Sequence, residues 1–183
     1  MEEQKQVAKT VAKTVASTND LDIKDLSDCE IRKTEAEYEG KENVILENLK
    51  NCKVYLPFKI KSLYAKHLEN CQIFAGCVSG AFFVNHAINC HLHICSHQIR
   101  IHNSQNTTFH LIAKSNPIIE HCSSMTFTPY NCTYAGLEEH QRDTGLYDIK
   151  NFWDQVLDFN WHRQEKSPNW STAAGEAETF VIG

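Results

Sequence analysis

The chain has 183 residues, of which 42% are hydrophobic, so it has room for one domain with an ample core and short tails. Its net charge of -5 argues against a general surface for nucleic acid or for anionic membranes. No apolar stretch is long enough to span a bilayer, and the start, Met-Glu-Glu-Gln-Lys, has neither an apolar leader nor the glycine needed for myristoylation. We therefore expect a cytoplasmic protein without a membrane anchor, whose eight cysteines are free thiols.

Residues 1–20 repeat the sequence Val-Ala-Lys-Thr. Val7, Val11 and Val15 are four residues apart and could form a thin stripe on one face of a short helix. The other residues are mostly Lys, Thr, Ala and Ser, which bury little apolar surface. We predict an N-terminal tail that is either flexible or helical.

Residues 21–130 contain an internal repeat. Three pairs, Asn51-Cys52, Asn70-Cys71 and Asn89-Cys90, follow one another at intervals of 19 residues. An earlier copy contains Asp28-Cys29, and looser copies occupy residues 104–109 and 122–127. A period near 20 residues is typical of a solenoid.

Each repeat carries two short β-patterns, with no helical periodicity between them. Two or three short strands per coil, stacked on the next coil, form a parallel β-helix. Asn suits the corners because it tolerates unusual backbone dihedral angles, and Cys packs inside as a small apolar residue. We therefore predict an all-β fold, a parallel β-helix over residues 21–130.

Residues 131–183 lose the repeat and hold all three tryptophans. The end of a solenoid exposes apolar core and unpaired strand edges, so we expect this stretch to form a mixed, aromatic-rich cap on the β-helix. Part of it is predicted to be a short amphipathic helix. The apolar face of this helix is expected to contain Leu146, Ile149, Phe152, Trp153, Val156 and Leu157.

The histidines and cysteines form no recognisable metal motif. The densest cluster, Cys-His-Leu-His-Ile-Cys at 90–95, cannot readily bring its side chains together around one ion from a strand. The chain also lacks Cys-x-x-Cys, His-Glu-x-x-His, the glycine loops of nucleotide-binding proteins and Gly-x-Ser-x-Gly. We predict no metal site and no cofactor, and no cysteine has the local context of a catalytic nucleophile.

Arg100 differs from the other three arginines because it lies between two apolar residues, Ile99 and Ile101. Strand alternation directs both isoleucines inward. Gln98, Arg100 and His102 are therefore expected to point outward on one face of the β-helix.

Two residues of neighbouring coils are expected beside Arg100. Phe82 and Val84 form the inward pair of the preceding coil, which leaves Phe83 facing outward. One coil later, an inward Ile119 places Glu120 outward beside Arg100. Aromatic residues and Arg dominate interface energetics, so this row has the composition of a partner-binding patch. A solvated Arg100 paired with Glu120, worth under about 1 kcal/mol, is equally compatible with the spacing.

Five motifs follow one another in the stretch from Leu21 to Trp170. They are Gln-Ile-Arg-Ile-His at 98–102, Pro-Ile-Ile-Glu-His-Cys-Ser at 117–123, Phe-Thr-Pro-Tyr at 127–130, Asn-Phe-Trp-Asp to Asp-Phe-Asn-Trp at 151–161, and Ser-Pro-Asn-Trp at 167–170. In these motifs the chain resembles the C-terminal C-CAP/cofactor C-like domain of the tubulin-folding cofactor C family. The resemblance implies a right-handed β-helix, in agreement with the fold expected from the repeat.

The resemblance also implies GTPase activation on a partner's active site rather than an enzyme with its own substrate. Arg100 matches the arginine finger that family members insert into the partner's nucleotide site, a contribution worth about 10³–10⁵ in rate. Glu120 matches an acidic residue that orients the arginine, and Phe159 matches an aromatic near the same surface. The implied partners are tubulin, with GTP on β-tubulin, and the folding cofactors D and E. Hydrolysis accompanies release of αβ-tubulin heterodimers, which implies a cytoplasmic, cytoskeleton-associated protein.

The chain departs from the family pattern in two places. His97 stands where the family usually has Gln, at a position expected to touch the nucleotide site, which leaves the activating strength open. The helical N-terminal domain of full-length cofactor C is not among these 183 residues, so we expect a fragment or a short paralogue. The residues expected to contact the partner, besides Arg100, are Phe83, His97, Gln98, His102, Glu120 and Phe159.

Two other functional classes remain open. Retinitis-pigmentosa protein 2, a lipid-anchored relative, activates Arf-like small GTPases, but the missing glycine after Met1 argues against this class. The related β-helix of cyclase-associated proteins is a cytoskeletal binding module without activating function. Arg100 in its full motif argues against that class.

Overall fold

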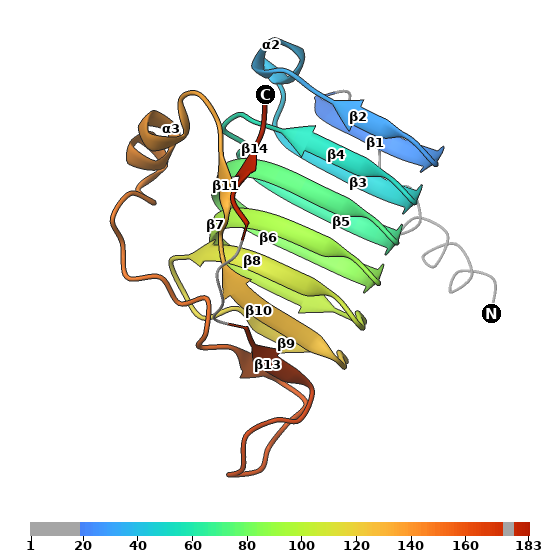
Figure 1. The fold of residues 1–183 in the computed structure, drawn as a ribbon, viewed down its shortest axis with the longest axis vertical. Helices are drawn as coiled ribbons and strands as arrows, with labels where there is room; N and C mark the ends of the chain where they lie inside the picture. The colour runs from blue at the N-terminus through green and yellow to red at the C-terminus, as the bar shows by residue number, and fades with distance from the viewer. Residues whose placement is uncertain (1–18, 174–177) are drawn as a thin grey trace, which may run out of the picture.

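The computed structural model describes residues 19–173 and 178–183, which form a parallel β-helix (Figure 1). The chain coils repeatedly around one axis, and the strands of each coil pair in parallel with those of the next. The parallel β-helix predicted from the repeat is therefore confirmed. The predicted N-terminal tail, with its valine stripe, lies outside the described residues.

Two parallel ladders run along the length of the β-helix. The long strands β6 and β7 belong to both, with their N-terminal halves in one ladder and their C-terminal halves in the other. The first ladder consists of β1 (Asp20–Ser27), β3 (Asn43–Lys50), β5 (Ser62–Glu69), β6 (Gln72–Ile88), β7 (His91–His102), β9 (Ile118–Glu120) and β12 (Leu157–Asp158). The second consists of β2 (Glu30–Arg32), β4 (Lys53–Leu56), β6, β7, β8 (Thr108–Ala113), β10 (Met125–Pro129) and β13 (Trp170–Thr172).

The core lies between the ladders and consists of alternate residues of each strand. Ile99 and Ile101 in β7 are buried, as the alternation predicted. The inward positions of neighbouring coils lie in register, so that each core side chain packs on its counterparts in the coils on either side. One such column of buried residues is Val54, Ile73, Leu92, Phe109 and Phe127.

The repeated Asn-Cys pairs form one corner of the β-helix. Asn51, Asn70 and Asn89 all have a φ near +50°, the left-handed conformation that Asn tolerates better than most residues. Their side chains bond from coil to coil; the Nδ2 of Asn70, for example, donates to the Oδ1 of Asn51 at 3.2 Å. The cysteines that follow them are buried, and all eight cysteines are free. The corner role predicted for the repeated pair is confirmed.

The C-terminal stretch folds differently from its predicted helix. The long helix in this region is α3 (Leu137–Thr144), which lies between two glycines in the left-handed conformation, Gly136 and Gly145. The prediction of a helix over 146–157 is wrong, because this segment runs along the solenoid as loop and turns until β12 begins at Leu157. Asn151 holds it there through Oδ1, which accepts from the amide of Ala113, and Nδ2, which donates to the carbonyl of Leu111.

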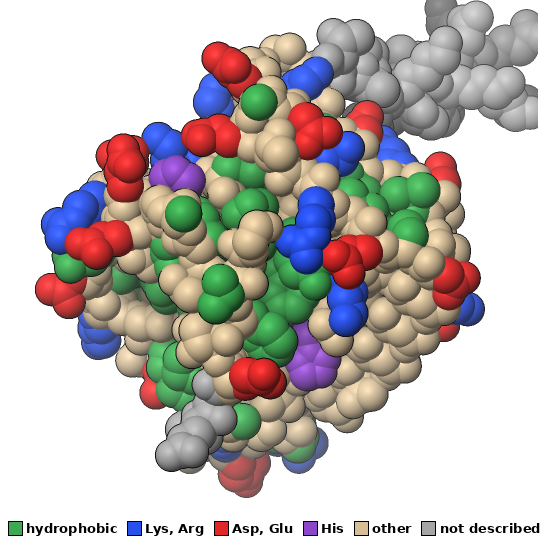
Figure 2. All heavy atoms as spheres, turned by 45° about the horizontal axis from the view of Figure 1, so that its top comes forward, with side chains coloured by type: hydrophobic (Ala, Val, Ile, Leu, Met, Phe, Trp, Pro, Cys, Tyr) green, Lys and Arg blue, Asp and Glu red, His purple; other side chains and the backbone are tan. Residues whose placement is uncertain are grey.

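Two further elements lie outside the ladders, namely the short helix α2 (Glu35–Tyr38) and the pair of strands β11 (Cys132–Thr133) and β14 (Phe180–Val181). Strand β14 brings Phe180 over the outward side of the second ladder, which we call the capped face. The outward side of the first ladder, which carries Arg100, we call the arginine face. In the view of Figure 2, hydrophobic side chains reach the surface in patches that charged side chains surround.

No helix in the described part of the chain is long and apolar enough to cross a bilayer.

Candidate functional site

Arg100 lies in a row of outward side chains that crosses the arginine face from coil to coil. The strand register places it between Phe83 of β6 and Ile118 of β9. The prediction that Phe83 lies beside Arg100 is therefore confirmed. We call the part of this row that runs from β3 to β12 the arginine row; it consists of Ile45, Tyr64, Phe83, Arg100, Ile118 and Leu157, and Asp22 of β1 is aligned with Ile45 at its far end.

The guanidinium group of Arg100 differs from those of the other arginines in its contacts. Arg32 pairs with Glu30 and lies over the ring of Tyr55, and Arg142 pairs with Glu138. Arg163 lies over the ring of Trp161. In the part of the chain that the structure describes, the guanidinium group of Arg100 makes no hydrogen bond, ion pair or ring contact. The ladder therefore fixes the backbone of Arg100, while its exposed guanidinium group has no partner among the described residues.

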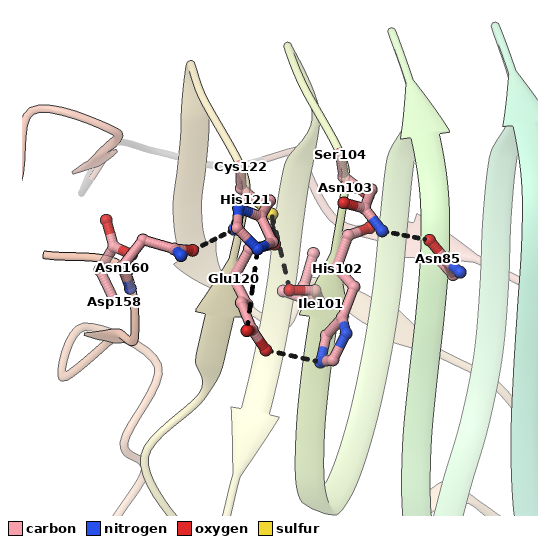
Figure 3. A network of polar contacts seen from close by, with 10 residues as sticks. All are labelled: Asn85, Ile101, His102, Asn103, Ser104, Glu120, His121, Cys122, Asp158 and Asn160. Carbon is pink, nitrogen blue, oxygen red and sulfur yellow. Dashed lines mark hydrogen bonds and ion pairs between the residues drawn. The ribbon is translucent and has the colours of Figure 1, made fainter.

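The position of Glu120 corrects the sequence prediction. Glu120 is aligned with His102, and its carboxylate lies 3.8 Å from His102 Nε2 and 3.9 Å from His121 Nε2 (Figure 3). It is therefore a diagonal neighbour of Arg100 rather than its direct neighbour. The sequence misplaced it because the spacing between equivalent residues shortens after Phe83, so that Ile118 takes the place opposite Arg100.

Gln98 and His102 flank Arg100 along β7, as strand alternation predicted. The ring of His102 meets that of Phe83 edge to face, with the centroids 5.0 Å apart. Gln98 and Arg100 line a hollow of about 250 Å³ together with Asn116, Ile118 and Leu157. This hollow gives the arginine room to change its direction without displacing the backbone.

His97 does not join this group. Its Nε2 bonds the carbonyl oxygen of Thr144 at the end of α3, and its own carbonyl accepts from the hydroxyl of Ser115. The imidazole therefore fastens the cap to the β-helix. The structure gives His97 a structural contact and places it away from the arginine row.

Phe159 lies on the arginine face beyond Glu120 and is 52% exposed. Its amide donates to the carbonyl of Ile119 at 3.0 Å, which holds the segment against β9. Asp158 organises the loop that follows, because its carboxylate accepts from Ser167 Oγ at 2.6 Å and from Asn169 Nδ2 at 2.8 Å. Burial opposes ionisation of Asp158, but these hydrogen bonds outweigh it and lower its pKa. The two motifs Asp-Phe-Asn-Trp and Ser-Pro-Asn-Trp thus serve to position Phe159.

Sequence reasoning missed four members of the arginine row. Ile45 and Tyr64 lie on the preceding coils, and Ile118 and Leu157 lie on the following ones. The signal for the first two was present, because Ile45, Tyr64 and Phe83 are separated by the same 19 residues as the Asn-Cys pairs. Leu157 was assigned instead to the predicted helix.

Among the described residues, no group of three or more His, Cys, Asp or Glu side chains is arranged to hold a metal ion. Around Arg100 the arginine face offers a cation, the carboxylate of Glu120, apolar and aromatic side chains, and hydrogen-bonding groups such as Gln98. Such a surface suits binding to another protein and delivery of a positive charge to it.

Comparisons with known proteins identify relatives of this chain. Tubulin-folding cofactor C of Arabidopsis thaliana is 37% identical over 168 residues, which cover 91% of this chain and 42% of that protein. Tubulin-specific chaperone C of Mus musculus is 43% identical over 81 residues, which cover 44% of this chain and 24% of that protein. This chain matches less than half of the length of either relative.

The fold has a counterpart among solved structures. Tubulin binding cofactor C from Leishmania major superposes with a TM-score of 0.63 at 26% identity, covering 72% of this chain and 90% of that one. The family model described as tubulin binding cofactor C matches residues 41–159, which include Arg100, Glu120 and Phe159. The chain therefore belongs to the tubulin binding cofactor C family.

Proposed function

We propose that this chain is a GTPase-activating protein of tubulin folding that supplies Arg100 in trans to the nucleotide site of tubulin. The substrate of the stimulated reaction is GTP on β-tubulin, held together with the folding cofactors D and E. Hydrolysis then accompanies release of the αβ-tubulin heterodimer in the cytoplasm, close to the microtubule cytoskeleton. The chain is an activator and not itself the enzyme, and it needs no cofactor of its own.

One observation carries this proposal, namely the uncommitted guanidinium of Arg100 on an exposed apolar row. A guanidinium that is paired in the free protein has to break that pair before it can enter a partner's site. Arg100 has no such pair among the described residues, and the ladder fixes its backbone. Its five N–H donors can stabilise the charge that develops on the transferred phosphoryl group.

The neighbours of Arg100 are proposed to position it and to contact the partner. Glu120 is diagonal to Arg100, a separation that long side chains can bridge, so it can still orient the guanidinium when the partner docks. Phe83 and Phe159 supply apolar contact on either side, and Gln98 supplies hydrogen bonds. Because His97 is engaged with Thr144, we assign it no contact with the nucleotide.

The test is GTP turnover by tubulin with cofactors D and E, with and without this chain. Arg100→Ala is expected to lower the stimulated rate by about 10³-fold or more, while thermal unfolding is unchanged because the side chain is exposed. Arg100→Lys keeps the charge but loses the planar fork of donors, so it should recover little of the activity. Arg163→Ala removes an equal charge from an exposed position elsewhere and should remain fully active.

Full activity of Arg100→Ala would falsify the arginine-finger role. A parallel series with Arf-like small GTPases identifies the partner, since stimulation of these GTPases alone would assign the chain to the other activator class. Binding to tubulin without any stimulation by the wild-type chain would indicate a non-activating cytoskeletal module.

A further inference from the structure

The arginine row continues past Phe83 toward the first coils, where it contains Tyr64 and Ile45. We propose that Ile45, Tyr64 and Phe83 form a docking strip that binds a nonpolar surface patch beside the nucleotide site of the same GTP-binding partner. This inference rests on the proposed function, because the partner is the protein that receives Arg100. It assigns affinity to the docking strip and rate acceleration to Arg100.

The position of the strip follows from the ladder. Neighbouring strands are about 4.8 Å apart, and Ile45 lies three strands from Arg100, so the strip reaches about 14 Å from the arginine. Leu157 lies two strands away on the other side, so the whole row is about 24 Å long. This length suits a standard interface of about 800 Å² per partner, with Arg100 near its middle.

Tyr64 has the environment of an interface anchor. It is 40% exposed, although it lies on a regular strand in the middle of the ladder. Within the described part of the chain its hydroxyl group makes no hydrogen bond. Tyr and other large aromatic residues contribute much of the binding energy when they become buried at an interface.

A shallow groove accompanies the strip. It has a volume of about 340 Å³, and Ile45, Tyr64 and Phe83 line it together with Glu47, Lys66 and Asn85. The groove offers a recess for an apolar side chain of the partner, which a flat surface would not provide.

The charges around the strip decide which kind of partner surface fits. The three residues of the strip are uncharged; at its border Glu47 lies 3.6 Å from Lys24, Asp22 is aligned with Ile45, and Lys66 lines the groove. Lys24 also lies 3.6 Å from Asp22. An apolar centre with a polar rim that carries charges of both signs is the usual anatomy of a protein interface. The complementary surface is therefore nonpolar at its centre, rather than strongly acidic or basic.

The test separates docking from catalysis by measuring the stimulated GTP turnover at increasing concentrations of the chain. Tyr64→Ala and Ile45→Asp are expected to raise the half-saturating concentration by about tenfold, the size of a hot-spot residue, and to leave the saturating rate unchanged. Tyr147→Ala is the matched control, because Tyr147 is 39% exposed but lies in the cap. It should behave as the wild type, and unchanged thermal unfolding shows that each variant is folded.

Direct binding to the tubulin–cofactor complex distinguishes the two proposals. Arg100→Ala should bind with near wild-type affinity, and adding Tyr64→Ala to it should weaken binding by about tenfold. An unchanged affinity and half-saturating concentration for both Tyr64→Ala and Ile45→Asp would overturn the docking strip and leave the arginine finger intact. A wild-type chain that binds but does not stimulate would instead overturn the proposed function, while a loss of binding in Tyr64→Ala would still support the strip.

Discussion

The same coils build the arginine face and the capped face, but another segment of the chain covers only the capped face. Both carry a row of outward aromatic rings. On the capped face Tyr55, Phe74, His93 and His110 stack with centroid separations of 4.9, 4.5 and 4.0 Å. Phe180 of β14 lies 5.3 Å from both Phe74 and His93, and Phe74 is only 2% exposed. On the arginine face the rings of Tyr64 and Phe83 stay in contact with solvent.

The difference teaches that outward direction alone does not decide exposure in a solenoid. Strand alternation sends a side chain out of the coil, and a segment from elsewhere in the chain then covers it or leaves it open. Here the C-terminal strand covers one aromatic row. The stacked rings of the capped face therefore contribute to stability, whereas the apolar side chains of the arginine face are available to a partner.

The largest expected effect compares one aromatic residue from each face. Phe74→Ala removes a buried ring from the stack and should lower the free energy of unfolding by about 3–5 kcal/mol. Phe83→Ala removes a half-buried outward ring and should cost clearly less, about 1–2 kcal/mol. Urea unfolding at pH 7 measures both values.

The effects of these two substitutions on the stimulation of GTP hydrolysis should follow the opposite order from their effects on stability. At a temperature where both are folded, Phe83→Ala should weaken the stimulation of GTP hydrolysis and Phe74→Ala should not. Equal losses of stability in the two variants would show that the capped face is not specialised for folding.

The next effect is a dependence of stability on pH that originates on the capped face. Burial, together with the nearby His110, lowers the pKa of His93 to about 3, although the hydrogen bond between its Nδ1 and Asn131 opposes this shift. Both folded and unfolded chains keep this ring neutral above about pH 6.5. As the pH falls below that value, the unfolded chain binds a proton that the folded chain refuses, so stability decreases. The loss from His93 should reach about 2 kcal/mol at pH 5.

The matched measurement is the free energy of unfolding at pH 7 and pH 5. His93→Phe keeps a ring in the stack and removes the titrating group, so the loss between the two pH values should shrink by about 2 kcal/mol. Some loss should remain, since burial also lowers the pKa of His110, to about 4. His162→Phe, at an exposed position, is the control and should keep the wild-type dependence. An unchanged loss in His93→Phe would contradict the burial of a neutral imidazole under Phe180.

The sequence predicted the solenoid well because the repeat is a local signal. Asn51, Asn70 and Asn89 mark corners that need a left-handed residue, and this requirement does not depend on distant contacts. The helix expected over 146–157 is not formed, because apolar spacing over a short segment fits a helix or a loop packed on the solenoid equally well. The side chain of Asn151 decides between them by bonding the backbone of β8, a contact that no local pattern contains.

The candidate site was predictable where it depends on local strand alternation, and not where it depends on distant contacts. Alternation around Ile99 and Ile101 placed Arg100 and His102 outward, and the structure agrees. The alignment of Glu120 with His102 depends on the length of the connection between β7 and β9, which a fixed period cannot supply. The contact of His97 with Thr144 at the end of α3 depends on where the C-terminal stretch docks, so no local pattern predicts it.

The smallest expected effect concerns strand β14, the segment that covers the capped face. Among the described residues, strand β14 pairs with β11 through two residues, and the buried Ile182 and the ring of Phe180 pack it against the cluster that contains Phe74. Phe180→Ala should lower the free energy of unfolding by about 1 kcal/mol and speed hydrogen exchange at the amides of residues 180 and 182, which bond the carbonyls of Asn131 and Thr133. Val181→Ala is the control on the same strand, because its side chain is 76% exposed and should change neither quantity. If Phe180→Ala leaves exchange at these amides unchanged, the ring is not what keeps the strand in place, and the contrast between the two faces must arise from β11 and α3 instead.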